Sequence, residues 1–178
     1  AFDIHGQEDA ITFRHLNRQG FTKIPGTTES WAMGFSPDSQ AVCYPTLDKL
    51  WRVALDGSKP VPVAPLADAY LTPGCAWSDT GDIVYPKGWK RGLMKVPAVG
   101  GAQETLTQLK PGETWHRWPQ CLAGATCVLF TMAVEDAQSG REITKAAIAD
   151  LATGKHYALP LEDNCTYVRY AQSGHILY

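Results

Sequence analysis

The 178-residue sequence lacks both a long apolar run and a strong net charge. No run approaches the roughly 20 apolar residues that a membrane-spanning helix requires, so we expect no membrane insertion. A formal net charge of −2 gives no electrostatic basis for binding DNA, RNA or an anionic membrane surface. We therefore expect no nucleic acid among the partners.

Common catalytic signatures are also missing. There is no Gly-x-Ser-x-Gly nucleophile motif, no glycine-rich phosphate loop and no zinc-protease motif. Adjacent acids such as Glu135-Asp136 and Glu162-Asp163 lie in expected loops, without the alternation of ligands that a calcium site needs. We expect no cofactor, no bound metal and no catalysis by this chain.

The sequence has five cysteines but no Cys-x-x-Cys pair, which leaves a zinc site little support. Only Cys121 and Cys127 are close in sequence, on the two arms of an expected hairpin. Two interpretations stay open. One is a cross-hairpin disulfide in an oxidising compartment; the other, which the apolar neighbours favour, is a set of small buried residues on strands.

Turn-forming residues are abundant, with 16 Gly and 12 Pro. A block made of an aromatic residue, a turn and an apolar strand recurs, in copies at 35–44, 77–85, 118–130 and 170–178. In the first copy, Pro37 presets φ for a turn, and Asp38 can accept a hydrogen bond from the backbone two residues on. We interpret each copy as a β-hairpin.

A second block holds a strand that ends near a turn glycine. Its copies lie at 50–57, 93–101 and 147–154, with a weaker one at 11–18. The two blocks together give four strands in about 40–45 residues, which is typical of one β-propeller blade.

These motifs carry a family resemblance. The aromatic-Ser-Pro-Asp turn at 35–38, and the strand Leu-Trp-Arg-Val at 50–53 with its Asp56-Gly57 end, resemble the TolB-like (WD-like) propeller repeats of bacteria. The stretches 113–119 and 150–154 are similar to propellers attached to bacterial eukaryote-like serine/threonine kinases. The resemblance covers about residue 11 to the last residue. It implies a propeller scaffold and favours a periplasmic or other extracytoplasmic location, while a cytoplasmic one stays open.

We therefore predict an all-β fold: one β-propeller domain over 1–178 with four blades' worth of four-stranded antiparallel sheet. The expected parts are an outer half-blade at 11–29, full blades at 30–66, 72–109 and 115–161, and an inner half-blade at 166–178. The recurring aromatic residues should occupy equivalent core positions on the inner strands. They are Phe35, Trp77, Trp118 and Tyr170.

The two half-blades have complementary needs, because open sheet edges are otherwise exposed. Three arrangements stay open: a complete four-bladed ring, a fragment of a larger ring, or a homo-oligomer in which two copies close one ring. Closure predicts that 176–178 pairs with the strand at 11–17, directly or in a partner molecule.

The first functional hypothesis is a binding module for a protein, peptide or small-molecule ligand. Its anchors would be aromatic residues of the inner strands and their entry loops, namely Trp31, Tyr70, Trp115 and Tyr167. Packing between blades is the competing interpretation of these residues. Arg117 and Arg169 are candidates for contacts to an anionic or carboxylate-bearing ligand.

His116 has two interpretations. With Arg117 it would form part of a central-channel site; alternatively it packs between blades and hydrogen-bonds a backbone group, which we favour. The second functional hypothesis is a lyase or hydrolase with a site at the channel mouth, drawing on Glu29, Glu113, His116, Arg117 and Arg169. Carboxylates clustered with His116 and a strongly shifted pKa would favour the enzyme, whereas a channel walled by aromatic and small residues would favour the binder.

Overall fold

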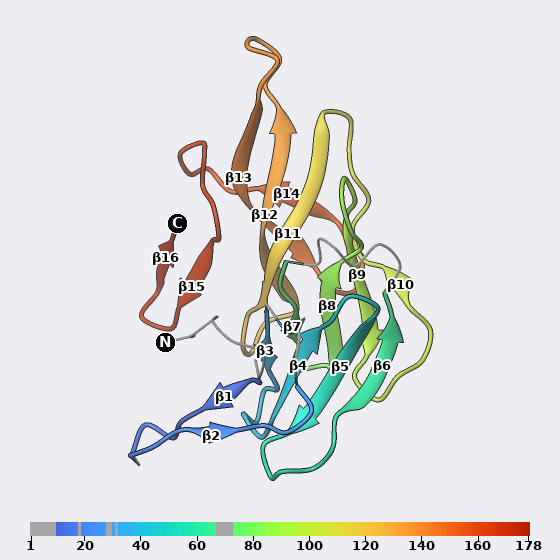
Figure 1. Ribbon diagram of the computed structural model, residues 1–178. Coiled ribbons are helices and arrows are strands. Elements are labelled where there is room, and N and C mark those ends of the chain that lie inside the picture. Colours follow the sequence, from blue (N-terminus) through green and yellow to red (C-terminus); the bar gives the residue numbers. More distant parts are fainter. Residues whose placement is uncertain (1–9, 18, 28–29, 31, 67–72) are drawn as a thin grey trace.

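The computed structural model describes residues 10–17, 19–27, 30, 32–66 and 73–178 (Figure 1). All regular structure in these residues is antiparallel β-strand, which confirms the expected all-β class. The same residues contain no helix that is long and apolar enough to cross a membrane. Three candidate site residues that were proposed from the sequence, Glu29, Trp31 and Tyr70, lie outside the described residues.

Three four-stranded sheets form the body of the molecule, and each runs in chain order from one edge strand to the other. The first sheet contains β3 (Gly34–Phe35), β4 (Ala41–Pro45), β5 (Lys49–Ala54) and β6 (Val61–Pro65). The second contains β7 (Ala76–Trp77), β8 (Asp82–Pro86), β9 (Leu93–Pro97) and β10 (Glu104–Thr105). The third contains β11 (Glu113–Cys121), β12 (Cys127–Glu135), β13 (Glu142–Asp150) and β14 (His156–Ala158).

The predicted turn chemistry connects these strands. Between β3 and β4, the Asp38 carboxylate Oδ1 accepts hydrogen bonds from the Gln40 N–H (3.0 Å) and from the Ser36 hydroxyl (2.6 Å). Between β13 and β14, Asp150 Oδ1 accepts hydrogen bonds from the N–H and the hydroxyl of Thr153, both at 2.7 Å. The short polar side chains thus fold the backbone back on itself at the places where the repeat requires it.

Two small sheets lie at the two ends of this series (Figure 1). β1 (Thr12–Phe13) pairs with β2 (Thr22–Lys23), and β15 (Arg169–Ala171) pairs with β16 (His175–Leu177). Among the described residues β16 does not pair with β1, so the prediction that 176–178 pairs directly with the strand at 11–17 is wrong for this chain. Pairing between two molecules stays a prediction.

The core lies between successive sheets. One cluster of buried apolar residues joins the first sheet to the second, and another joins the second to the third. The small sheets pack outside this series, β1–β2 on the first sheet and β15–β16 on the third. Each sheet is therefore stabilised mainly by the apolar faces of its neighbours.

The predicted core aromatic residues are not the main core residues. Phe35 and Tyr170 are 51% and 38% exposed, and Trp77 and Trp118 are only partly buried. Among the described residues, the fully buried Tyr and Phe side chains are Tyr44, Tyr85 and Phe130, which occupy equivalent positions on the second strand of each sheet. The second strand has a neighbour on both sides, whereas Phe35 ends a two-residue edge strand that is paired on one side only.

All five cysteines are free thiols, and Cys121 and Cys127 are not joined. Cys121 lies opposite Val128 in the β11–β12 register. Cys127 precedes Val128 and points to the other face of the sheet, because side chains alternate along a strand. The close pair is Cys43 and Cys75, whose Sγ atoms lie 3.2 Å apart.

Candidate functional site

Strand β11 carries chemistry on both of its faces, and a turn fixes its start. The sequence Lys110-Pro111-Gly112-Glu113 places proline and glycine at the two central positions of a turn. Gly112 has a φ of 86°, and the Glu113 N–H donates to the Lys110 carbonyl oxygen at 2.9 Å. The Lys110 N–H in turn donates to the Glu113 carboxylate Oε2 at 2.7 Å. This exchange holds the carboxylate in place at the strand's first residue.

A β-bulge brings Glu113 and His116 to the same face of the sheet. Residues three apart on a regular strand point to opposite faces. Here the register with β12 shifts between Glu113 and Trp115, so that Glu113 lies opposite Val134 and His116 opposite Met132. Because one extra residue occupies the bulge, the alternation is reset and both side chains point the same way.

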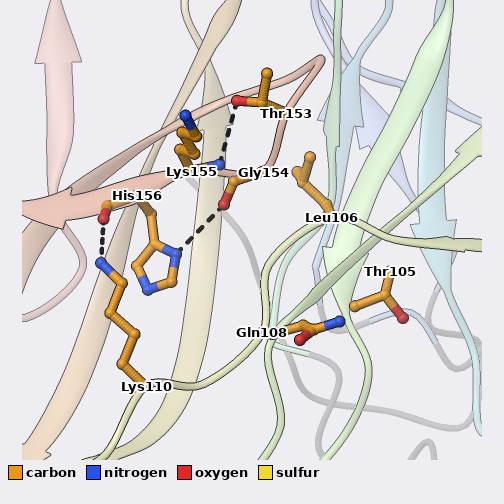
Figure 2. Close-up of a pocket in the computed structure, with 8 residues that line it drawn as sticks. All are labelled: Thr105, Leu106, Gln108, Lys110, Thr153, Gly154, Lys155 and His156. Carbon is orange, nitrogen blue, oxygen red and sulfur yellow. Dashed lines mark hydrogen bonds between the residues drawn. The ribbon is translucent and has the colours of Figure 1, made fainter.

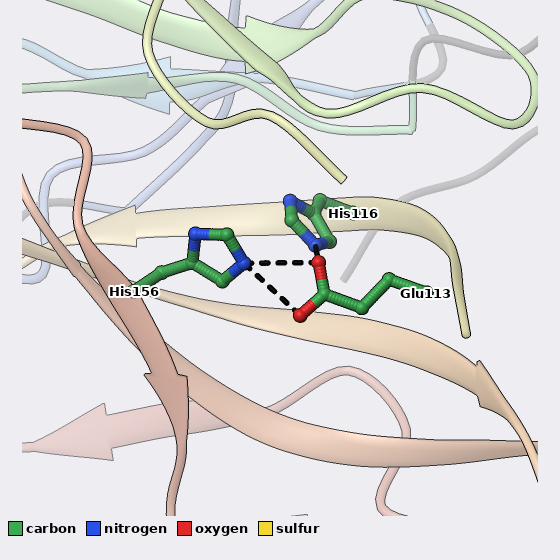
Figure 3. Close-up of side chains that lie close together, drawn as sticks. All are labelled: Glu113, His116 and His156. Carbon is green, nitrogen blue, oxygen red and sulfur yellow. Dashed lines mark hydrogen bonds and ion pairs between the residues drawn. The ribbon is translucent and has the colours of Figure 1, made fainter. Parts of the chain in front are cut away.

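Three side chains on this face form a compact cluster, shown in Figure 3. The His156 Nε2 atom lies 3.1 and 3.0 Å from the two carboxylate oxygens of Glu113. The His116 Nε2 atom lies 3.2 Å from the Glu113 Oε2 atom. The side chains of Glu113, His116 and His156 are 6%, 0% and 3% exposed, so the cluster is shielded from water.

His156 reaches this cluster from β14, at the opposite edge of the third sheet. Both histidine rings contact the Phe130 ring, with centroid separations of 4.8 Å for His116 and 6.1 Å for His156. Between them β13 presents the small residues Ala147 and Ala149, both buried. These alanines leave room for the His156 ring to extend across the sheet.

Surrounding groups orient the second nitrogen of each ring. The His116 Nδ1 atom lies 2.8 Å from the Thr107 hydroxyl, which also accepts a hydrogen bond from the Leu93 N–H. The His156 Nδ1 atom lies 3.4 Å from the carbonyl oxygen of Gly154. Each imidazole is thus held from both sides.

Burial and charge shift the titration of the cluster in defined directions. Burial lowers the pKa of His116 to about 4, against the opposing attraction of Glu113, so the ring is neutral at pH 7. Burial acts to raise the pKa of Glu113, but the Lys110 N–H and the contact with His156 outweigh it and the pKa lies below its usual value. The site therefore combines an ionised carboxylate with a neutral imidazole.

An open groove of 520 Å³ adjoins the cluster through His156 (Figure 2). Its remaining lining consists of Thr105, Leu106, Gln108, Lys110, Thr153, Gly154 and Lys155. The Lys110 ammonium donates a hydrogen bond to the backbone carbonyl of His156. The two lysines give this groove a positive lining.

The other face of β11 carries a cation–π stack. The Arg117 guanidinium lies between the Trp89 and Trp115 rings, 4.3 and 4.2 Å from their centroids. Arg117 is buried, and its Nε and Nη2 atoms have no hydrogen-bond partner among the described residues. Burial lowers the pKa of Arg117, and the negative charge of Glu142 partly opposes this shift. The Glu142 carboxylate accepts hydrogen bonds from Thr114 and Trp115 rather than from Arg117.

A second bulge extends this surface toward the C-terminal sheet. The β11–β12 register shifts again between Arg117 and Gln120, and Trp118 has a φ of 53°, uncommon for an aromatic residue. This bulge removes Trp118 from the regular core position that the repeat predicted. The Trp118 ring contacts Trp115 and Tyr167, and Arg169 lies 4.0 Å above the Tyr167 ring while donating to the Trp118 carbonyl oxygen at 2.9 Å.

We call this set the arginine–aromatic surface; it comprises Trp89, Trp115, Arg117, Trp118, Tyr167 and Arg169. It brings together four of the residues that the sequence proposed for binding: Trp115, Arg117, Tyr167 and Arg169. His116 lies on the opposite face and is buried as favoured, but its ring contacts Thr107 and Glu113 side chains in place of a backbone group.

Sequence reasoning missed His156 and Trp89. No spacing pattern links His156 to Glu113, because their contact depends on the β11 bulge and on the alanines of β13. Trp89, in the connection between β8 and β9, carried no repeat signal.

Comparison with known proteins supports the fold and gives no family. No protein-family model and no curated protein sequence matches the chain. Among solved structures, a protein assigned as TolB from Agrobacterium tumefaciens matches with a TM-score of 0.67 and 16% identity, over 88% of this chain and 57% of that one. The chain thus spans little more than half the length of that structure.

Two further structures show the same architecture at lower similarity. The nidogen/laminin complex matches with a TM-score of 0.59 and 10% identity, over 78% of this chain and 51% of that one. An ancestral GH74 enzyme matches with a TM-score of 0.54 and 8% identity, over 81% of this chain and 22% of that one. With identities this low, the likeness concerns the fold alone: a β-propeller built of four-stranded antiparallel blades.

Proposed function

We propose that this β-propeller chain is a binding module without catalysis of its own, and that it holds an anionic group of its ligand at the arginine–aromatic surface. Arg117 is the observation that carries the proposal. Its guanidinium is buried beside two indole rings, and within the described part of the chain its Nε and Nη2 atoms lack an acceptor. Leaving such donors unpaired costs free energy, which a binding function would explain.

The geometry around Arg117 supports a carboxylate as the bound group. The Trp89 and Trp115 ring centroids lie 4.3 and 4.2 Å from the Arg117 guanidinium carbon, so we expect a ligand to bind at the guanidinium edge that carries Nε and Nη2. A planar carboxylate can accept two parallel N–H bonds from such an edge. Trp89, 52% exposed in the loop after β8, is the part of the surface that must move to uncover it.

The backbone of the surface also favours binding over packing. Trp118 and Tyr167 both have positive φ values, 53° and 54°, which cost energy in residues other than glycine. Residues held in such conformations gather at ligand sites, where the surrounding structure compensates for the strain. Arg169 contributes by bonding the Trp118 carbonyl oxygen across the bulge.

The test is a fluorescence titration, because three tryptophans lie at the surface. We expect short acidic peptides to change tryptophan emission saturably and with a marked dependence on salt concentration. Arg117→Lys keeps the charge but loses the two-pronged edge, so it should weaken binding by roughly 10-fold or more. Arg141→Lys, in the exposed β12–β13 connection, is the matched control and should bind as the wild type does. Equal affinities for the two variants would contradict the proposal.

The second candidate function is a lyase or hydrolase at the His156 groove. The observation that favours it is the ionised Glu113 beside a neutral, buried His116, at the margin of a groove with a positive lining. A screen of ester, glycoside and uronide substrates tests it. Turnover that His116→Ala abolishes would replace the binding proposal with the enzyme.

The biological setting follows the resemblance noted in the sequence. We propose a bacterial sensor or scaffold of the TolB-like type, in an extracytoplasmic compartment, that binds a protein, peptide or small molecule. A homo-oligomer through the terminal sheets is part of this proposal, since Leu177 and Tyr178 are 60% and 56% exposed. Deleting 176–178 should then lower the mass measured in solution; an unchanged mass would contradict the oligomer.

A further inference from the structure

We propose that Glu113, His116 and His156 form a binding site for a divalent transition-metal ion of the zinc type. The inference concerns the face of β11 opposite the arginine–aromatic surface, so it is independent of the proposed binding function. The three residues each offer one ligand atom, and these atoms lie within 4.8 Å of one another. Two imidazole nitrogens and one carboxylate form a common ligand set for Zn²⁺.

The spacing of the donor atoms fits a small cation. In a tetrahedral site with bonds of about 2.0–2.1 Å, the ligand atoms lie about 3.3 Å from one another. The two histidine Nε2 atoms lie 3.2 Å (His116) and 3.0 Å (His156) from the Glu113 Oε2 atom. The remaining separation, between the two histidine nitrogens, is no more than 4.8 Å.

The hydrogen-bond partners of His156 favour a cation at its Nε2 atom. Its Nδ1 atom faces the Gly154 carbonyl oxygen and its Nε2 atom faces the Glu113 carboxylate, so both nitrogens face acceptors. A neutral imidazole has a single N–H and can satisfy only one of them. A metal ion between His156 and Glu113 leaves the N–H on Nδ1, directed at Gly154.

The outer contacts have the arrangement that supports metal-bound histidines. Such a histidine donates its other ring N–H to a carbonyl, carboxylate or similar acceptor. Thr107 Oγ1 occupies this position for His116 at 2.8 Å, and the Gly154 carbonyl occupies it for His156 at 3.4 Å. The Glu113 carboxylate is held by the Lys110 N–H at 2.7 Å.

Nearby positive charge does not fill the site. The Lys110 ammonium is directed at the His156 backbone carbonyl, and among the described residues the ion-pair partners of Glu113 are the two histidines. The competing arrangement has no metal: a protonated His156 ring forms a buried ion pair with the Glu113 carboxylate. Because three protein ligands leave one position open, a bound ion would take water or another small ligand as its fourth partner.

The first experiment measures retention of metal by the whole chain. The protein is stripped with EDTA, dialysed, given one equivalent of Zn²⁺ or Co²⁺, desalted and analysed for metal content. We expect about one Zn²⁺ per chain, a thermal midpoint that rises with Zn²⁺ and falls back with EDTA, and a Co²⁺ absorption spectrum of nitrogen and oxygen ligands.

Variants separate the metal site from the imidazolium–carboxylate pair. His156→Gln keeps an N–H donor for Glu113 but removes the metal ligand. Loss of an outer-shell partner alone costs about 10–100-fold in affinity, so loss of this ligand should cost at least about 100-fold. His175→Gln is the matched control: His175 lies on β16, is exposed, and its ring Nδ1 atom is hydrogen-bonded to the Ser173 hydroxyl. It should bind metal as the wild type does.

The outcomes decide between the arrangements. Specific retention in the wild type and in His175→Gln, lost in His156→Gln and Glu113→Gln, supports the site. A folded wild type that retains neither ion, or a His156→Gln variant that binds as well as the wild type, overturns it. So does a thiolate charge-transfer band in the Co²⁺ spectrum, which would place the ion on the cysteines. His116→Gln is a third ligand variant. If it fails to fold, His156→Gln and Glu113→Gln still decide whether the metal site exists.

Discussion

The Sγ atoms of Cys43 and Cys75 lie 3.2 Å apart, between the first and second sheets of the propeller. Cys43 belongs to β4, and Cys75 directly precedes β7. Both are buried, and Gly34 packs beside them, where an added Cβ would meet the Cys75 carbonyl oxygen and the Cys43 sulfur. The two thiols are thus held together by the packing of two sheets.

We predict that an added disulfide oxidant, such as oxidised glutathione, joins Cys43 to Cys75. The two thiols lose two protons and two electrons, and the oxidant is reduced. Burial raises the pKa of Cys75 well above its usual value, so thiolate is scarce at pH 7 and the reaction should accelerate as the pH rises. Intact mass after alkylation of the remaining thiols should show a loss of two alkylation sites.

The same disulfide should stabilise the fold. It would close a loop between residues 32 apart, for which loop-closure entropy gives at most about 3–4 kcal/mol, reduced by any strain. Cys43→Ser should remove the effect, while Cys165→Ser, at a buried cysteine elsewhere, should preserve it. If all five thiols still react with the alkylating agent after the protein has been treated with the oxidant and denatured, the prediction is wrong.

Core truncations distinguish the true core positions from those that the repeat suggested. Phe130→Ala should lower the free energy of unfolding by roughly 3–5 kcal/mol, since Phe130 is fully buried on the second strand of its sheet. Phe35→Ala should lower the free energy of unfolding by less than about 1 kcal/mol, because the residue is already 51% exposed. Urea denaturation of both variants measures the difference. Equal losses would mean that Phe35 packs more deeply than the structure shows.

The sequence predicted the sheets because their signals are local. Turn residues such as Asp38 and Asp150 act within three positions, and the repeat of strand and turn blocks sets the four-stranded unit. The aromatic positions were misplaced because burial depends on which strand has neighbours on both sides. That property belongs to the sheet rather than to the hairpin.

Of the two candidate sites on strand β11, only the arginine–aromatic surface could be predicted from the sequence. The residues Trp115 and Arg117 share a face because they are two apart on a strand, and this could be expected from alternation. Glu113 and His116 share a face only because a bulge breaks the alternation, and His156 joins them only across the alanines of β13. Neither the bulge nor that contact leaves a local pattern in the sequence.

Two glycines with similar backbone angles give a controlled test of the turn before His156. Gly154 and Gly124 have φ values of 67° and 71°, but an added Cβ on Gly154 collides with the Leu106 carbonyl, whereas Gly124 has open space. Gly124→Ala should lower the free energy of unfolding by about 1–2 kcal/mol, which is the penalty for alanine in the left-handed conformation. Gly154→Ala should cost clearly more, because backbone must shift.

Thermal or urea unfolding of the two alanine variants measures this difference. The shift at Gly154 should also displace His156, so Gly154→Ala should bind Zn²⁺ more weakly than Gly124→Ala does. Equal stabilities for the two variants would show that the turn and the Leu106 segment can separate without loss.

The last prediction separates a functional role of Arg117 from a structural one. Arg117→Met keeps a long side chain between Trp89 and Trp115 and removes the two donors that lack acceptors. The variant loses a cation–π interaction of up to about 2 kcal/mol, but it also loses the penalty of about 1–3 kcal/mol for an unsatisfied buried donor. We therefore expect the free energy of unfolding, without ligand, to stay the same or to rise.

Arg169→Met is the matched control, because the Arg169 guanidinium donates hydrogen bonds to the carbonyl oxygens of Trp118 and Val168, both at 2.9 Å. Losing these bonds should destabilise the protein by about 1–3 kcal/mol. A structural role for Arg117 predicts the reverse order, with Arg117→Met the more destabilised variant. A side chain that can be replaced without loss of stability, yet is needed for binding acidic peptides, is held in place for its ligand.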